Sequence, residues 1–132
     1  MAEQITYGRV ATVDLDFSDA VERVRALLKE QGFGVLCEID VAKTMKEKIG
    51  AEFRPYLILG ACNPQLAHRA LSAESHLGLL LPCNVVVQSQ DGKTVVSAVD
   101  AAKMLDVVGN PALRDVAEDA NSRLQSALDA LT

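Results

Sequence analysis

Two apolar segments, each interrupted by a Cys-Asn pair, are the feature that most constrains the fold of this chain. Residues 57–64 read Leu-Ile-Leu-Gly-Ala-Cys-Asn-Pro, and residues 79–87 read Leu-Leu-Leu-Pro-Cys-Asn-Val-Val-Val. Runs this apolar are typical of strands that are covered on both faces or central in a sheet. Pro82 has no amide hydrogen to donate to a neighbouring strand, so it marks a strand start, a bulge or an edge. We therefore expect a strand–helix–strand unit with irregularities at Asn63-Pro64 and at Pro82.

Periodicity predicts the other elements. Alternating apolar residues indicate strands, and a repeat at three, four and seven positions indicates helices. One helix is expected from Ser18, its capping residue, to Gly32, because glycine suits the left-handed turn after a helix. The expected strands are 9–15, 33–41, 56–61, 79–90 and 93–99, and the further helices are 41–49, 64–73 and 111–130, with a helical turn over 101–105.

This order of elements predicts one α+β domain. We expect a βαβ-β-αβ-β order plus a C-terminal helix, in two layers with helices on one face of a mainly antiparallel sheet. A chain of 132 residues fits a single domain, residues 1–132 with a core from about 10 to 131. On the second strand, Val35, Cys37 and Ile39 are expected to share a face, which places Cys37 in the core.

Composition and charge exclude several classes of partner. The net charge of −5 disfavours nucleic acid, whose binding depends on clustered Lys and Arg. No apolar run approaches the ~20 residues that a membrane span needs. Residues 1–4 lack the basic and apolar regions of a signal peptide, and three cysteines without a short-range pattern suit reduced thiols. We expect a cytoplasmic protein that binds neither nucleic acid nor membrane.

The candidate site lies at the two Cys-Asn pairs: Cys62, Asn63, Cys83 and Asn84. Asn63 and Pro64 are the preferred cap and first residue of a helix, which explains them structurally. Cys62 precedes that helix N-terminus, where the helix dipole would lower the pKa of a thiol. The two cysteines are 21 positions apart, so only the fold can bring them together. These four residues are predicted to bind a small ligand.

A soft metal ion is a further candidate for the same corner. Two thiolates suit Cu(I), Zn or an iron–sulfur centre, and Cys62 and Cys83 are the expected ligands. Two ligands are too few for a closed site, so a second copy of the chain, His68 or His76 would have to complete it. The alternatives are plain: buried cysteines are common small hydrophobic residues, and both histidines suit a solvated surface.

Several motifs in order resemble the domain of unknown function 302 family. They are Pro55-Tyr56, Gly60-Ala-Cys-Asn-Pro64, the run from Leu77 to Val85, and the hairpin Asp91-Gly-Lys-Thr-Val95. The resemblance covers the chain from about Val10 to Leu131. It implies a compact α+β domain, often a homodimer, with no established activity. It also implies that the two cysteines belong to one branch, so thiol chemistry is not the function of the whole family.

Three hypotheses about function follow, in order of preference. The first is a binding module for a small ligand or a soft metal at the cysteine corner. The second is a homodimeric interaction protein, with the strand from Leu79 to Val87 and the C-terminal helix as a two-fold interface. The third is a protein that handles thiols or sulfur. No residue pattern assigns a reaction, so whether the chain is an enzyme is left open.

Overall fold

The computed structural model describes residues 5–132. Residues 1–4 lie outside that range. They are the residues from which we predicted the absence of a signal peptide, and they begin the expected domain. The strands are β1 (Gly8–Val13), β2 (Gly34–Asp40), β3 (Tyr56–Cys62), β4 (Cys83–Gln90) and β5 (Lys93–Val99). The α-helices are α1 (Phe17–Glu30), α2 (Val41–Ile49), α3 (Pro64–Ala73), α4 (Ala101–Asp106) and α5 (Arg114–Asp129), and two 3₁₀ helices are η1 (Ser75–Leu80) and η2 (Pro111–Leu113).

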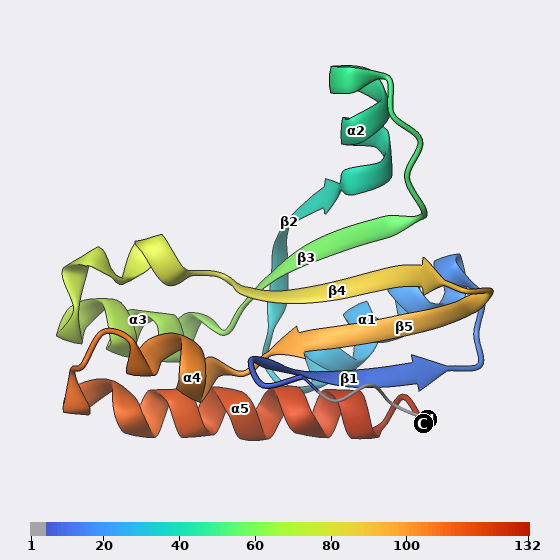
Figure 1. Ribbon diagram of the computed structural model, residues 1–132. Helices are drawn as coiled ribbons and strands as arrows, with labels where there is room; N and C mark the ends of the chain where they lie inside the picture. Colours follow the sequence, from blue (N-terminus) through green and yellow to red (C-terminus); the bar gives the residue numbers. More distant parts are fainter. Residues whose placement is uncertain (1–4) are drawn as a thin grey trace.

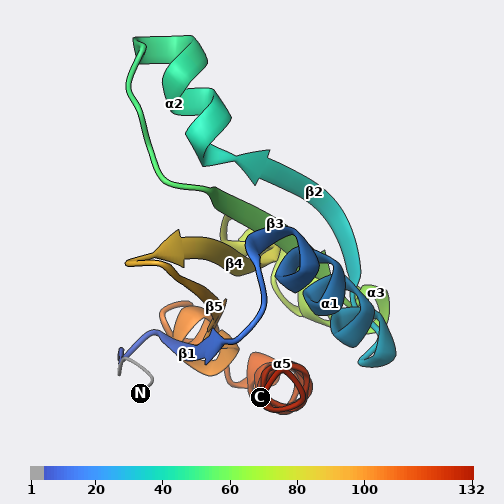
Figure 2. The same cartoon turned by 90° about the vertical axis from the view of Figure 1, so that its right-hand side faces the viewer.

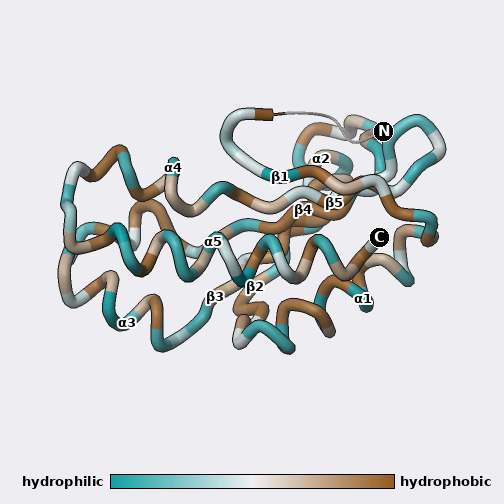
Figure 3. Tube along the Cα trace, turned by 90° about the horizontal axis from the view of Figure 1, so that it is seen from below, coloured by the Kyte–Doolittle hydropathy of each residue, from teal (hydrophilic) through white to brown (hydrophobic). Residues whose placement is uncertain are grey.

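One antiparallel sheet, in the order β1-β5-β4-β3-β2, forms the centre of the molecule (Figure 1). Helices α1 and α5 lie on one side of it (Figure 2). Seen from below, α1 and α3 lie across the picture from β1 and β5, and hydrophobic residues recur along each helix (Figure 3). The predicted α+β fold is therefore confirmed. We call the opposite side of the sheet the outer face.

The core lies between the sheet and the helices. Alternate residues Leu57, Leu59 and Ala61 of β3 are buried there, as are Val85 and Val87 of β4. A second cluster joins α3, α4 and α5 at one end of the sheet. No helix within residues 5–132 is both long and apolar enough to cross a membrane.

The start of α1 differs from the prediction. Asp16, rather than Ser18, is the capping residue, and its Oδ1 accepts a hydrogen bond from the Asp19 amide at 2.9 Å. Both residue types cap helices well, so the sequence does not choose between them. Gly32 follows the end of α1 with a φ of 83°, as expected for the left-handed turn.

The strand predicted over 79–90 is wrong at its beginning. Residues 75–80 form the 3₁₀ helix η1, and β4 starts only at Cys83, directly after Pro82. Leu77 is buried and anchors η1, whereas Leu79 is 86% exposed. An unbroken apolar run does not distinguish a strand from a helical turn, so only the proline marked the true boundary.

The placement of Cys37 in the core is also wrong, because β2 contains a bulge. Val35 pairs with Ala61 and Cys37 with Gly60, which leaves Leu36 as an extra residue. An inserted residue reverses the alternation of faces beyond it. Cys37 therefore turns to the outer face and is exposed, while Glu38 turns to the helix side, where it forms an ion pair with Arg25 of α1.

Residues 34–55 form an arm that projects from the molecule. It comprises β2, α2 and the segment leading to β3, and α2 stands clear of the other helices in two perpendicular views (Figures 1 and 2). None of its residues is buried. Its large apolar side chains at the surface are Leu36, Ile39, Ile49 and Phe53. The arm keeps regular structure although it has no core of its own.

Gly60 generates the first prediction, because neither of its neighbours leaves room for a side chain. A Cβ there would lie 2.6 Å from Cys37 Sγ and 2.8 Å from Pro82 Cγ. We expect Gly60→Ala to lower the free energy of unfolding, measured by urea denaturation, by about 1–3 kcal/mol. Adding Cys37→Ala should recover part of that loss.

The matched control is Gly34→Ala, because no atom lies within 4 Å of a Cβ at Gly34. Full stability of Gly60→Ala, or no recovery on adding Cys37→Ala, would contradict the steric argument.

Candidate functional site

A cavity of about 300 Å³ lies where the end of the sheet meets α3, α4 and α5. Its walls come from the last residues of β3, the first of β4, and the facing sides of the three helices. The lining residues are Phe33, Leu36, Ala61, Cys62, Asn63, Leu66, Ala67, Ala70, Leu71, Gly78, Leu81, Pro82, Cys83, Ala101, Met104, Leu105, Val116 and Ala120. None of them carries a charged side chain.

The pairing of β3 with β4 brings both candidate cysteines to this cavity. Ala61 lies opposite Cys83 in the register, so Cys62 is only one position further along the neighbouring strand. Cys83 is 8% exposed, and Cys62 is half-buried. The sequence left open whether the two thiols meet, and both cysteines line this cavity.

Burial keeps the two thiols protonated. It raises the pKa of Cys62, and it raises that of Cys83 from 9.0 to about 11, with the neighbouring Cys62 adding to the shift. The expected lowering of the Cys62 pKa by the helix dipole is therefore wrong in direction. The cause is loss of solvation, because an apolar wall disfavours the charged thiolate.

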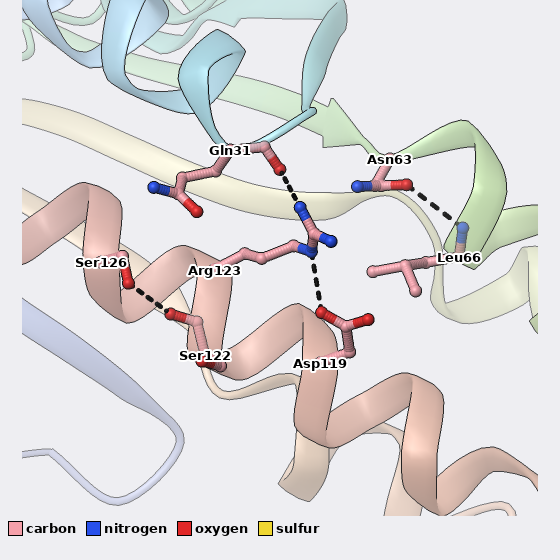
Figure 4. A network of polar contacts seen from close by, with 7 residues as sticks. All are labelled: Gln31, Asn63, Leu66, Asp119, Ser122, Arg123 and Ser126. Atoms are coloured by element: carbon pink, nitrogen blue, oxygen red, sulfur yellow. Dashed lines mark hydrogen bonds and ion pairs between the residues drawn. The ribbon is translucent and has the colours of Figure 1, made fainter.

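Asn63 contributes the amide on the cavity wall, and its oxygen is already engaged. As the cap of α3, its Oδ1 accepts a hydrogen bond from the Leu66 amide at 3.2 Å (Figure 4). Its Nδ2 lies 3.0 Å from the position of a Cβ on Gly32. Arg123 of α5 binds the end of α1 beside it, since its Nη1 donates to the Gln31 carbonyl at 3.1 Å. This corner is thus held firmly from three helices.

The α4 wall is fixed by polar contacts with α5. Asn121 Oδ1 accepts from the Ala101 amide at 2.6 Å, and its Nδ2 donates to Asp100 Oδ1 at 2.9 Å. Burial alone would raise the pKa of Asp100, but the hydrogen bonds from Asn121 and from backbone amides, with the charge of Arg9, lower it. Asp100 therefore remains ionised and keeps α4 in position.

The other predicted site residues lie away from the cavity. Asn84 is exposed and pairs with Gly60 in the register. His68 and His76 are exposed and do not line the cavity. Within residues 5–132, no group of three or more His, Cys, Asp and Glu could hold a metal ion. Two protonated thiols without a third donor do not fit a closed soft-metal site.

Sequence reasoning missed most of the cavity. Met104 and Leu105 of α4 and Val116 of α5 line it, yet their spacing indicates only an apolar helix face. No local signal separates a residue that packs against its neighbour from one that faces a void. The five alanines among the lining residues are the one hint of a cavity in the sequence, because small side chains leave space between facing helices and strands.

A larger hollow of about 430 Å³ lies between α4, η2 and the start of α5. Lys103, Asp106, Arg114 and Glu118 line it, so both signs of charge face it. It contains none of the residues predicted from the sequence. We therefore take the Cys62–Cys83 cavity as the candidate site.

The buried thiol generates a second prediction, on pH. The pKa of Cys83 is higher in the folded chain than in the unfolded chain, so the unfolded state releases its proton first as pH rises. The free energy of unfolding should therefore fall as pH rises from 9.0 toward about 11. Urea denaturation across this range should give a steeper fall for the wild type than for Cys83→Ala. Equal slopes for the two proteins would contradict the shift, whatever their absolute stabilities.

Comparison with known proteins identifies the family of this chain. The family described as "Domain of unknown function DUF302" matches residues 9–131. A crystal structure of an uncharacterized conserved DUF302 protein from Bacillus stearothermophilus is 31% identical, covering 97% of this chain and 100% of that chain, with a TM-score of 0.90. No curated protein matches. The chain, with its paired cysteines at the end of β3 and the start of β4, belongs to the DUF302 family.

Proposed function

We propose that this protein binds a small, uncharged and largely apolar molecule in the Cys62–Cys83 cavity. The observation that carries the proposal is the lining, which has eighteen residues and no charged side chain. A buried ion would lose its hydration without a partner of opposite charge, so such a lining rejects ions. An apolar molecule would instead replace water at an apolar surface.

The volume limits the size of the ligand. Small-molecule sites commonly measure roughly 300–1,000 Å³, and an engineered cavity of roughly 150 Å³ holds one benzene. The cavity of about 300 Å³ therefore suits a molecule of about two fused or linked rings, or a chain of similar volume.

The thiols favour this function over the two other chemistries. A soft metal would require both thiols to deprotonate, and burial acts against that step. Thiol or sulfur transfer would also require a thiolate as nucleophile. As protonated groups, Cys62 and Cys83 instead offer polarisable, weakly polar surface that suits an apolar ligand.

The proposal generates the third prediction. The uncharged fluorophore N-phenyl-1-naphthylamine should bind the wild type and brighten as it leaves water. Ala67→Phe, which fills the cavity from α3, should weaken binding at least about tenfold, or ~1.4 kcal/mol. Ala73→Phe is the matched control, because Ala73 is exposed on the same helix.

Two outcomes would contradict the proposal: no binding by the wild type, or equal loss of binding in Ala67→Phe and Ala73→Phe. Equilibrium dialysis with Zn²⁺ tests the metal alternative on the same samples. Stoichiometric zinc that disappears in Cys62→Ser and Cys83→Ser would favour a metal site instead.

A homodimer is the second candidate, and the arm of residues 34–55 favours it. Regular structure without a buried residue is unusual for a segment of this length, since helices of nine residues are marginal alone. Burial against a second copy would supply the missing apolar contacts. Location in the cytoplasm and the absence of nucleic-acid binding stay predictions from composition.

A further inference from the structure

The hollow of about 430 Å³ between α4 and α5 differs from the Cys62–Cys83 cavity in its charge, and we call it the charged hollow. The two helices lie side by side at one end of the molecule and are joined through η2 (Figure 1). Two basic and two acidic side chains line the hollow: Lys103 and Asp106 from α4, and Arg114 and Glu118 from α5. Each helix therefore contributes one charge of each sign.

Apolar side chains form the floor of the charged hollow. Leu105, Leu113 and Ala117 line it and are buried, with exposed fractions of 5%, 2% and 5%. The four charged residues are exposed instead, so they stand around the rim. A ligand that fits this arrangement has an apolar body and carries its charged groups at one end.

The charges on the rim do not neutralise one another. Within residues 5–132, none of the four rim residues forms an ion pair. On the same helix, Arg123 Nε lies 2.7 Å from Asp119 Oδ1 at a spacing of four positions. Arg114 and Glu118 have that spacing too, but the base precedes the acid, which is the order that favours pairing less. Their charges therefore remain available to an external group.

The rim selects for a ligand with both signs of charge. Its two cations and two carboxylates sum to zero, so a ligand with a single charge would meet repulsion as well as attraction. A ligand with one carboxylate and one ammonium group matches both kinds of residue. The planar fork of Arg114 suits the carboxylate, because a guanidinium binds it through two parallel hydrogen bonds. Asp106 and Glu118 accept hydrogen bonds and so suit the ammonium group.

Contacts with neighbouring elements fix the walls of the charged hollow. Asn110 lies in the loop before η2, and its Nδ2 donates to the Ala73 carbonyl and to Glu74 Oε1, both at 3.2 Å. Its Oδ1 accepts from the Ala112 amide at 3.0 Å. The end of α3 therefore holds the loop, while Asn121 holds the start of α4. Walls that are fixed before binding reduce the entropy lost when a ligand enters.

We propose that the charged hollow binds a small zwitterion with an apolar body, of the class of α-amino acids with an apolar side chain. Its carboxylate lies at Arg114 and Lys103, and its ammonium group lies at Glu118 and Asp106. Its side chain lies on the apolar floor. The volume of about 430 Å³ is within the roughly 300–1,000 Å³ that is common for small-molecule sites. The site is distinct from the Cys62–Cys83 cavity, whose uncharged lining rejects such a ligand.

The first test compares three ligands on the full chain by isothermal titration calorimetry at neutral pH. L-phenylalanine has both charges, hydrocinnamate lacks the ammonium group, and phenethylamine lacks the carboxylate, while all three keep the phenyl ring. L-phenylalanine should bind, and each analogue should bind at least about tenfold more weakly, because it loses its contacts with two rim residues. No binding of L-phenylalanine, or an analogue that binds as tightly, would overturn the proposal.

The second test uses substitutions that remove one charge from the rim. Arg114→Gln should weaken the binding of L-phenylalanine about threefold to fivefold and leave that of phenethylamine unweakened, since phenethylamine has no carboxylate. Glu118→Gln should have the same effect on L-phenylalanine and leave hydrocinnamate unweakened. Because two ligands are compared on one variant, a general loss of stability does not produce this pattern. Equal weakening of both ligands in either variant would overturn the assigned contacts.

The matched controls are Arg69→Gln and Asp115→Asn. Both residues are exposed, and they line neither the charged hollow nor the Cys62–Cys83 cavity. Ala67→Phe, which fills the Cys62–Cys83 cavity, should also leave the binding of L-phenylalanine unchanged. Loss of binding in Ala67→Phe would locate the ligand in the other cavity and overturn the inference, as would equal weakening by the two controls.

Discussion

The antiparallel pairing of β3 with β4 is the constraint on which the rest of the structure depends. Because Ala61 lies opposite Cys83, alternate residues of both strands fall on opposite sides of the sheet. One side supplies the buried core, including Leu59, Ala61 and Cys83. The other side, the outer face, carries Ile58 and Val86. A slip of one residue would exchange these sets, so the register decides the identity of both surfaces.

Much of the fold follows from the sequence, because its elements have strong local signals. Asn63-Pro64 marks the start of α3, and Asp91-Gly92 joins β4 and β5, where Asp91 and Gly92 both have positive φ. The buried residues of β3 and β4 belong to the two apolar runs from which these strands were predicted. Such signals depend on a few neighbouring residues, so tertiary contacts rarely override them.

The predictions are wrong where one inserted residue or one long-range contact determines the position of a side chain. The alternation of Val35, Cys37 and Ile39 predicts a common face, and the bulge at Leu36 breaks it. Cys62, Asn63 and Cys83 could be singled out from the sequence, but the rest of the cavity could not, because its walls join α3, α4 and α5 across long separations in sequence. Likewise, the direction in which the pKa of Cys62 shifts depends on burial, and the helix-dipole argument does not take burial into account.

The bulge also explains how one strand serves two surfaces. Leu36 lines the cavity, while Cys37 and Ile39 face outward. If the same residues paired without a bulge, Cys37 would lie opposite Leu59 on the helix side, and Arg25 would lose its carboxylate partner. Glu38 would then lie opposite Ile58 and would place a negative charge on the outer face. The insertion thus keeps carboxylates off the strands of that face and one leucine at the cavity.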